Sequence, residues 1–203
     1  MIHLGKLHEV HLRCFSSQIV ENGAEGWQAQ IRDTTTGIAA ARWAPDSRQI
    51  LTYSGSFLRL SVWSLVTLGP VAYISNPKML PPKGLAFTGN SKFAAIAERK
   101  DAKDVIGVYY AGNDWKMVSQ IEADTYDLQD VKWVGGDSSI LVWDSALECK
   151  ILMYSAYTGD RLAEYNPAVV GLGIKSLTVS PDGNTLAAGL FDGNIFLYNN
   201  LTC

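Results

Sequence analysis

Histidine, cysteine and carboxylate side chains are the residues in this chain that could do chemistry, and those near the start come closest to a motif. His8 and His11 flank Glu9, but they lie three residues apart, whereas the helical zinc motif needs histidines four apart. With Cys14 they would form only a partial zinc site, because no fourth ligand lies near in the sequence. We therefore expect residues 1–26 to be a leader or the remnant of a preceding structural unit, and not a metal centre.

The rest of the chain contains no recognisable catalytic set. It has no glycine-rich phosphate loop, no Gly-x-Ser-x-Gly turn and no histidine after His11. The commonest general base is therefore missing, and the carboxylates show no paired spacing. These carboxylates include Asp127, Asp130, Asp144 and Glu148. We expect no enzyme activity, no cofactor and no metal ion.

The densest group of charges lies at residues 98–104. It comprises three acids and three bases: Glu98, Arg99, Lys100, Asp101, Lys103 and Asp104. As a loop on a rigid scaffold, this segment could present charges to a partner, and mixed charge contributes specificity and association rate more than affinity. The alternative is a solvated hairpin loop whose charges keep a sheet edge from aggregating. We name these six residues as a candidate partner-binding site, with the alternative left open.

Composition excludes several classes of protein. Of 203 residues, 47% are hydrophobic and 18% are charged, which argues against wholesale disorder. The net charge of −3 and the lack of a basic run argue against a nucleic-acid partner. No apolar stretch is long enough for a signal peptide or a membrane span, so we expect no membrane partner. Three unpaired cysteines, Cys14, Cys149 and Cys203, fit a reduced, cytoplasmic protein.

An internal repeat organises the chain and predicts which elements carry these residues. One series of anchor positions is spaced by 44, 46 and 46 residues, and comprises Trp43, Phe87, Trp133 and Val179. A second series is spaced by 46, 45 and 44 residues, and comprises Trp63, Tyr109, Tyr154 and Tyr198. This period is close to that of a WD-type propeller blade. We expect the aromatic anchors to fill the core between sheets, since they supply large buried area with few rotamers.

Each repeat contains short alternating apolar segments separated by turn signals, which predicts a four-stranded antiparallel meander. The fold class is therefore all-β, a WD40-type β-propeller within residues 27–203. We expect about four blades, at residues 38–75, 83–122, 128–165 and 174–199. Residues 27–31 look like the outer strand of a preceding blade, and the last blade lacks its outer strand. We expect an incomplete ring, from a larger propeller or a truncated gene product.

The dipeptide Trp143-Asp144 matches the two residues that name WD repeats, but we place it in the second strand of its blade and not in the third. Asp192 stands where WD repeats usually carry a turn aspartate. No histidine is available to pair with it, so the usual buried hydrogen-bond set of such repeats cannot be complete.

Beyond this general pattern, four segments are unusual for a propeller blade: residues 97–104, 124–128, 142–155 and 172–176. Through these segments the chain resembles the centrosomal and spindle-pole WD-repeat proteins encoded antisense to a tumour-protein gene. The resemblance runs from about Trp27 to Tyr198 and includes connections between strands as well as the strands themselves.

The resemblance implies a non-catalytic scaffold in the cytoplasm, located in the cytoskeleton at centrosomes, spindle poles or basal bodies. Implied partners are a coiled-coil anchoring protein and, in fungi, a minus-end kinesin; implied processes are microtubule anchoring and ciliogenesis. Two other propeller adaptors stay open, a ubiquitin-ligase substrate receptor and a translation-factor-like propeller. The first usually shows Trp-Asp followed by arginine at a third-strand end, and the second would need a basic surface; neither is visible here.

Overall fold

The computed structural model describes residues 11–19, 25–32, 36–112, 114–167 and 173–199, with the backbone alone described up to residue 29. All regular structure among these residues is β-strand. Accordingly, no helix in the described part of the chain has the length and apolarity needed to cross a membrane. The chain forms two compact units, residues 1–75 (unit 1) and 76–203 (unit 2).

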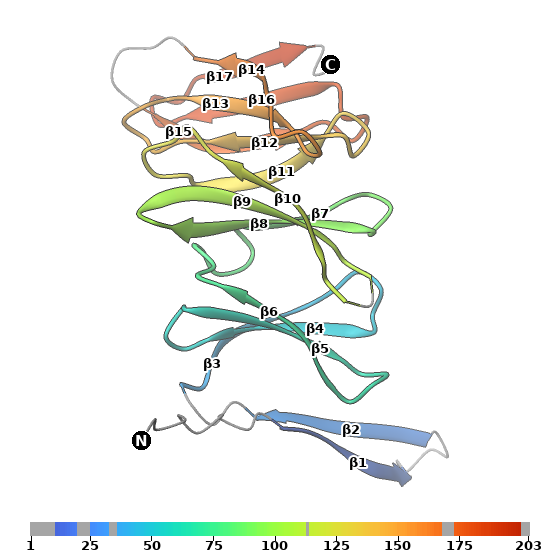
Figure 1. The fold of residues 1–203 in the computed structure, drawn as a ribbon. Helices are drawn as coiled ribbons and strands as arrows, with labels where there is room; N and C mark the ends of the chain where they lie inside the picture. The colour runs from blue at the N-terminus through green and yellow to red at the C-terminus, as the bar shows by residue number, and fades with distance from the viewer. Residues whose placement is uncertain (1–10, 20–24, 33–35, 113, 168–172, 200–203) are drawn as a thin grey trace, which may run out of the picture. The chain divides into compact units, whose positions relative to one another are not determined.

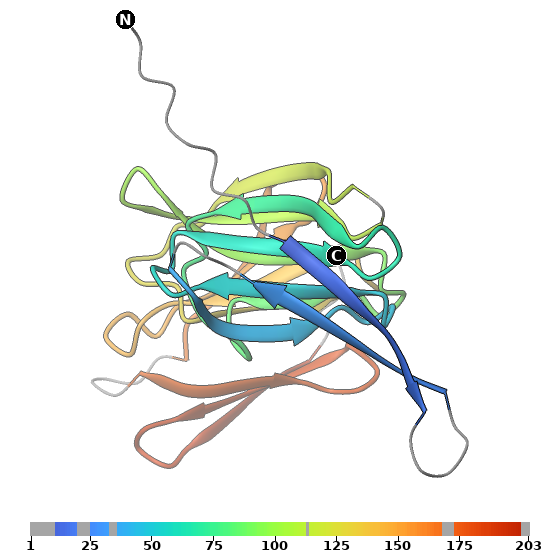
Figure 2. The ribbon, with the colours of Figure 1, turned by 90° about the horizontal axis from the view of Figure 1, so that it is seen from below.

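Unit 1 contains a hairpin and one four-stranded meander (Figures 1 and 2). The hairpin pairs β1 (His11–Ile19) with β2 (Glu25–Arg32), and β2 contains the segment 27–31 that the sequence marks as a strand. The meander, blade 1, consists of β3 (Ile38–Trp43), β4 (Gln49–Ser54), β5 (Arg59–Ser64) and β6 (Gly69–Ser75), paired in that order. Its two middle strands are buried along most of their length, whereas β3 and β6 are exposed or half-buried except at Ile74 of β6.

Unit 2 contains three further meanders, each paired in chain order (Figure 1). Blade 2 consists of β7 (Leu85–Phe87), β8 (Phe93–Lys100), β9 (Lys103–Tyr110) and β10 (Met117–Glu122). Blade 3 consists of β11 (Asp130–Val134), β12 (Ser139–Trp143), β13 (Ile151–Ser155) and β14 (Arg161–Tyr165). Blade 4 has three described strands, β15 (Ile174–Val179), β16 (Thr185–Leu190) and β17 (Ile195–Asn199). The predicted fold class, an all-β protein of WD40-type propeller blades, is confirmed.

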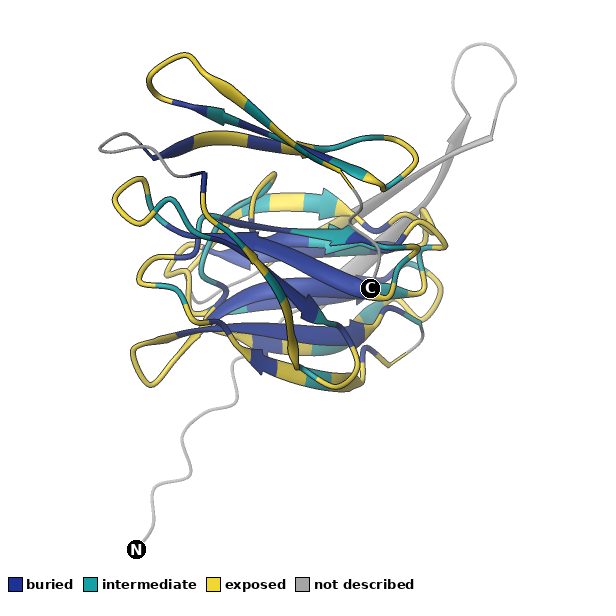
Figure 3. Ribbon diagram, turned by 90° about the horizontal axis from the view of Figure 1, so that it is seen from above, coloured by how far each residue is buried: buried dark blue, intermediate teal, exposed yellow. Residues whose placement is uncertain are grey.

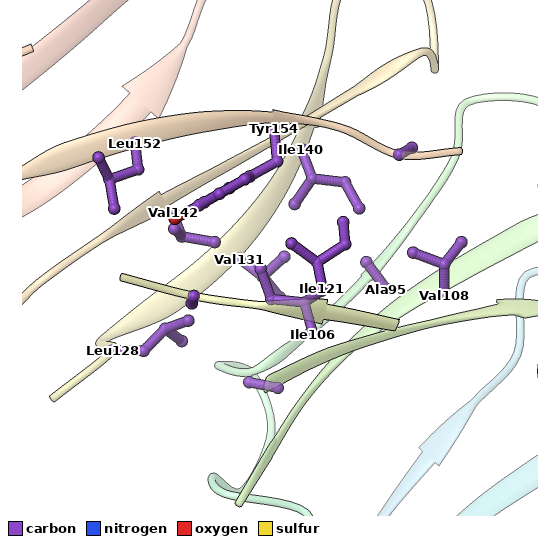
Figure 4. Close-up of a cluster of buried hydrophobic side chains, with 13 residues drawn as sticks. Ala95, Ile106, Val108, Ile121, Leu128, Val131, Ile140, Val142, Leu152 and Tyr154 are labelled. Atoms are coloured by element: carbon purple, nitrogen blue, oxygen red, sulfur yellow. The ribbon is translucent and has the colours of Figure 1, made fainter. Parts of the chain in front are cut away.

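Hydrophobic side chains between successive blades form the core of unit 2. One cluster joins blades 2 and 3 and includes Ile106, Ile121, Ile140 and Leu152 (Figure 4). A second cluster joins blades 3 and 4 and includes Leu141, Ile151, Leu177 and Leu186. Buried residues follow the middle strands of the sheets, and exposed residues gather at the turns (Figure 3). Blade 3 therefore buries both faces of its middle strands by packing against blade 2 on one side and blade 4 on the other.

The two aromatic series differ in burial. Trp63, Tyr109 and Tyr154 of the third strands are between 1% and 5% exposed, as expected for core residues. The prediction was wrong for Trp43, whose exposed fraction is 52%. Trp43 ends β3, an edge strand of its sheet, so its side chain has a neighbouring strand on one side only. The other members of the first series, and Tyr198, are half-buried.

Replacing Leu152 with alanine tests the packing between blades 2 and 3. Leu152 is fully buried in their shared cluster, so Leu152→Ala should lower the free energy of unfolding by about 2–5 kcal/mol. The control is Leu162→Ala in the same blade, where the side chain is 41% exposed and the change should stay within about 0.5 kcal/mol. Urea unfolding followed by tryptophan fluorescence measures both, and equal losses would contradict this packing.

Candidate functional site

The candidate residues lie at one end of unit 2, where three connections meet because neighbouring strands are antiparallel. Lys100 pairs with Lys103 and Glu122 with Val105, so the turn 101–102 and the end of β10 share one edge. The connection 123–129 then leads into β11, whose first residue pairs with Trp143. The connection 144–150 follows Trp143 directly. We call this edge, with residues 101–102, 123–129 and 144–150, the hairpin end.

Residues 98–104 are a tight hairpin and not the loop that the sequence predicted. The ladder of β8 and β9 continues to Lys100 and Lys103, which leaves only Asp101 and Ala102 in the turn. Both have positive φ, 49° and 62°, as in the type I′ turns that match the twist of paired strands. The sequence hides this turn because it lacks the usual Asn-Gly or Asp-Gly signal, and charged residues have low strand propensity.

Asp104, one of the six candidates, is buried and collects donors from four residues. Lys78 Nζ lies 2.7 Å from its Oδ2 and Arg99 Nη1 lies 2.8 Å from its Oδ1. The backbone N–H of Leu128 donates to Oδ2 at 2.7 Å, and Thr125 Oγ1 donates at 3.2 Å. A buried carboxylate is tolerated only when it is paired and hydrogen-bonded in this way. Asp104 therefore fastens the connection 123–129 to the hairpin and is not available to a partner.

Asp144 fastens the same connection from the other side. It is fully buried, and its two oxygens accept the backbone N–H groups of Tyr126 and Asp127, each at 2.8 Å. A third N–H, from Ser145, donates to Oδ1 at 2.6 Å. The tryptophan–aspartate pair lies at the end of the second strand, as predicted, and its aspartate shapes the hairpin end.

Glu98 is also buried, and it faces inward across β9. Its Oε1 accepts a hydrogen bond of 2.7 Å from the Tyr109 hydroxyl. Gly107 makes room for this pair, because a Cβ there would lie 2.1 Å from Glu98 Oε1. Burial raises the pKa of Glu98 above its ordinary value of 4.5, against the lowering effects of the Tyr109 hydrogen bond and of the Lys100 charge. Glu98 therefore supports the hairpin from within.

Arg99, Lys100, Asp101 and Lys103 are the candidates whose side chains reach the surface. Arg99 is committed to Asp104, Lys103 pairs with Glu122, and Lys100 Nζ lies 3.5 Å from Gln120 Oε1. The structure thus divides the six candidates into two that are buried supports and four that are exposed. Their role in binding a partner stays a prediction.

The surface of the hairpin end has two hollows and a further set of ion pairs. The hollows measure about 410 and 380 Å³, and both are lined by Lys103 and Glu122. Lys150 Nζ lies 2.7 Å from Asp124 Oδ2, and this bond holds the pKa of Asp124 below its ordinary value. Tyr126, 79% exposed, lines the larger hollow. This surface therefore combines two hollows with the ion pairs Lys103–Glu122 and Lys150–Asp124.

Metal binding finds no support among the residues described. No group of three or more histidine, cysteine, aspartate or glutamate side chains in that part of the chain could hold an ion. The side chains of His8, His11 and Cys14 lie outside the described residues.

Sequence reasoning missed Lys78 and Tyr126 at this end. Lys78 is distant in sequence from Asp104, and only the path of the connection before β7 brings it there. Tyr126 is placed by the two hydrogen bonds of Asp144 to its connection. Asp144 was the available sequence signal for this connection, because an aspartate directly after a strand can accept hydrogen bonds from backbone N–H groups of a neighbouring connection.

Blades 1 and 2 contain an equivalent hydrogen bond between their second and third strands. Trp63 Nε1 donates to Thr52 Oγ1 at 2.8 Å in blade 1, and Tyr109 donates to Glu98 in blade 2. Both pairs are 11 residues apart, and the two pairs are offset by 46 residues, the repeat period. An aromatic residue of the third strand thus bonds a polar residue of the second strand at the same place in both blades.

Antiparallel meanders of this period, with a third-strand aromatic bonded to the second strand in blades 1 and 2, are blades of the WD40 propeller type. The WD40 family (WD domain, G-beta repeat) matches residues 170–199, which cover blade 4. The chain is also similar to the mouse protein "WD repeat-containing protein WRAP73", with 37% identity over 176 residues. The match covers 87% of this chain and 37% of the mouse protein, so the chain spans little more than a third of that relative's length. WD40 repeat proteins are generally non-catalytic scaffolds, and WD40 domains generally mediate protein–protein interaction.

Substituting Asp104 tests whether it fastens the hairpin end. Asp104→Asn keeps the shape but removes the charge that Lys78 and Arg99 approach, and should lower the free energy of unfolding by about 3 kcal/mol. Asp101→Asn in the exposed turn is the matched control and should change it by less than about 0.5 kcal/mol. Chemical denaturation of both variants measures the difference. A loss at position 104 no larger than at 101 would show that the buried network contributes little.

The raised pKa of Glu98 predicts a pH dependence. A carboxyl group whose pKa is higher in the folded state contributes stability below its ordinary value of 4.5 and loses this contribution as pH rises through the folded pKa. Glu98→Gln keeps an acceptor for the Tyr109 hydroxyl and cannot ionise. Its melting temperature relative to wild type should therefore rise as the pH rises above about 4.5. Calorimetry across this range measures it, and a constant difference would contradict the burial of an ionisable Glu98.

Proposed function

We propose that this chain is part of a non-catalytic WD-repeat adaptor in the assembly of microtubule-organising centres and the anchoring of microtubules. Support comes from the resemblance of residues 97–104, 124–128, 142–155 and 172–176 to the centrosomal family encoded antisense to a tumour-protein gene. The 37% identity to a mouse WD-repeat protein supports the coarser part of the proposal. The sites of action in this proposal are centrosomes, spindle poles and basal bodies of cilia, all cytoskeletal structures of the cytoplasm.

The observation that carries the proposal is the ordered hairpin end. Three of the resembling segments, residues 97–104, 124–128 and 142–155, contribute to it, and buried Asp104 and Asp144 hold their connections in place. A surface fixed in advance loses little conformational entropy when a partner binds. Candidate partners are a coiled-coil anchoring protein and a minus-end kinesin, as the family resemblance implies.

Within this surface, Lys100 and Lys103 are the residues that would contact the partner directly. Both side chains are exposed, and their neighbours Gln120 and Glu122 are exposed as well. Arg99 is better regarded as a support, because its guanidinium lies against buried Asp104. A partner with acidic residues would compete for the two lysines in an association that weakens as salt rises.

A more general adaptor is the alternative. A ubiquitin-ligase substrate receptor would use a tryptophan–aspartate pair followed by arginine at a third-strand end, and these ends read Trp63-Ser64, Tyr109-Tyr110, Tyr154-Ser155 and Tyr198-Asn199. A translation-factor-like propeller would use a basic surface, whereas this chain has 20 acidic and 17 basic residues. Location separates these classes, because only the proposed adaptor should mark the poles of a dividing cell.

Reversing both lysines tests the contact. Lys100→Glu/Lys103→Glu should reduce recovery of the coiled-coil partner at least tenfold at low salt, because two attractive charges become repulsive. Stability should change little, since exposed ion pairs contribute about 0–1 kcal/mol. Tagged protein in dividing cells should lose its pole signal, and pull-down with the purified partner measures the binding.

The matched control is Lys92→Glu/Lys116→Glu, the same charge change on exposed lysines at the opposite end of blade 2. This control should keep both binding and location. If both double variants lost partner binding equally, net charge alone would explain the loss, and the hairpin end would not be the binding surface. A wild-type protein that never marks the poles would refute the assignment to microtubule-organising centres.

A further inference from the structure

The two faces of blade 4 differ in how far they are covered. One face packs against blade 3, and its residues Leu177, Leu186 and Ala188 are at most 6% exposed. On the opposite face, Ile195 and Leu197 of β17 are each 71% exposed. The middle strand β16 alternates between buried and half-buried residues, whereas β12 in the same position of blade 3 is buried throughout. We call the second face the open face of blade 4.

The register of the strands makes the open face one continuous surface. Residues paired directly across antiparallel strands have their side chains on the same side of the sheet. Leu197 of β17 pairs with Ala187 of β16. Ile195 pairs with Gly189, and Gly189 pairs with Ser176 of β15, whose Oγ would lie 2.9 Å from a Cβ at Gly189. Two large apolar side chains on β17 therefore lie beside a row of small residues.

The repeat indicates what kind of surface the open face is. Ile195 and Leu197 follow Ile151 and Met153 of blade 3 by 44 residues, the repeat spacing between these blades. Ile151 and Met153 are 0% and 3% exposed, because they pack in the cluster between blades 3 and 4. The equivalent residues of blade 4 thus occupy positions that contact a further sheet in the preceding blade. The open face is shaped to receive another β-sheet.

Charge favours a neutral partner for this face. Of the described residues that strand register places on the open face, none carries a charge. The charged residues of blade 4 lie elsewhere: Asp182 and Asp192 are in the turns, where they accept backbone N–H groups, and Lys175 Nζ lies 5.9 Å from the centre of the Phe191 ring, just after β16. A neutral apolar face can pack against a copy of itself without charge repulsion and without burial of an unpaired ion.

Blade 1 lacks an equivalent open face in its described middle strands. Leu51 and Val62 on one face are fully buried. Thr52 and Trp63 on the other face are 6% and 1% exposed. A head-to-tail contact, with blade 4 of one copy on blade 1 of the next, therefore has no second free face. The open face of a second copy is the matching surface that the chain itself provides.

We propose that two copies of this chain associate through the open face of blade 4, about a two-fold axis that runs parallel to the strands between β16 and β17. Paired residues lie at the same height along the strands, so this axis places Leu197 of each copy over Ala187 of the other. It likewise places Ile195 over Gly189. Large side chains then pack on small ones between two aligned sheets, and the contact closes after two copies. The association does not depend on the proposed role at microtubule-organising centres.

Sedimentation velocity of the 203-residue chain tests the stoichiometry. Wild type should form a dimer at micromolar concentration. Leu197→Glu should raise the dissociation constant of the dimer at least tenfold, because it buries an unpaired carboxylate. The variant should keep its circular dichroism spectrum, since this side chain is exposed in the single chain. A monomeric wild type, an open-ended assembly or an unchanged dimer in the variant would each overturn the proposal.

The matched control is Leu147→Glu. It makes the same charge change at a leucine that is 92% exposed in the connection after β12, away from the open face. This control should dimerise as wild type does. If it weakens the dimer as much as Leu197→Glu, association responds to net charge and the proposed face is wrong.

A mixture of two variants tests the register of the contact. Ala187→Lys alone should weaken the dimer, because it places an ammonium group opposite Leu197 of the other copy. In an equimolar mixture with Leu197→Glu, the new ammonium at position 187 faces the new carboxylate at position 197. The mixed dimer should then be at least tenfold tighter than the dimer of either variant alone. Absence of this recovery would mean that the copies meet differently, for example edge to edge along β17, and would overturn the proposed packing.

Discussion

The carboxylate of Asp104 is the interaction on which the order of the hairpin end depends. A charge removed from water in this way is stable only with full compensation, and Lys78, Arg99, Thr125 and the Leu128 N–H provide it. Because these donors come from three separate stretches of chain, one buried group fixes all of them at once. Asp144 repeats the arrangement in blade 3 with backbone donors alone.

The blades of this chain share the position of a bond between the second and third strands, although the residues that form it differ. Blade 1 joins the second and third strands through Thr52 and Trp63, and blade 2 joins them through Glu98 and Tyr109. The second pair buries an ionisable group, which Gly107 accommodates by lacking a Cβ. Tyr154 of blade 3 instead accepts the backbone N–H of Asp124 at 2.9 Å. In blades 1 to 3 the third-strand aromatic therefore keeps its place in the core, while its polar group bonds a different partner in each of these blades.

Function in such a scaffold falls to the ends of the sheets, because the middle strands are committed to packing. In unit 2 the hairpin end carries the ion pairs Lys103–Glu122 and Lys150–Asp124, so the partner that we propose would exchange these pairs for its own, which favours specificity over affinity.

The sequence alone determined the repeat, the strand order within each blade and the buried third-strand aromatics, because period and alternation are properties of the chain itself. Tertiary structure decided the fate of the charged residues. Glu98 and Asp104 are charged residues of the kind found in solvated loops, yet they lie on the paired strands β8 and β9 and are buried. Trp43 is a large aromatic residue of the kind expected in the core, yet it is exposed because β3 is an edge strand. Burial depends on which segments pack against a residue, and neighbours distant in sequence, such as Lys78 and Asp104, meet only once the sheets have formed.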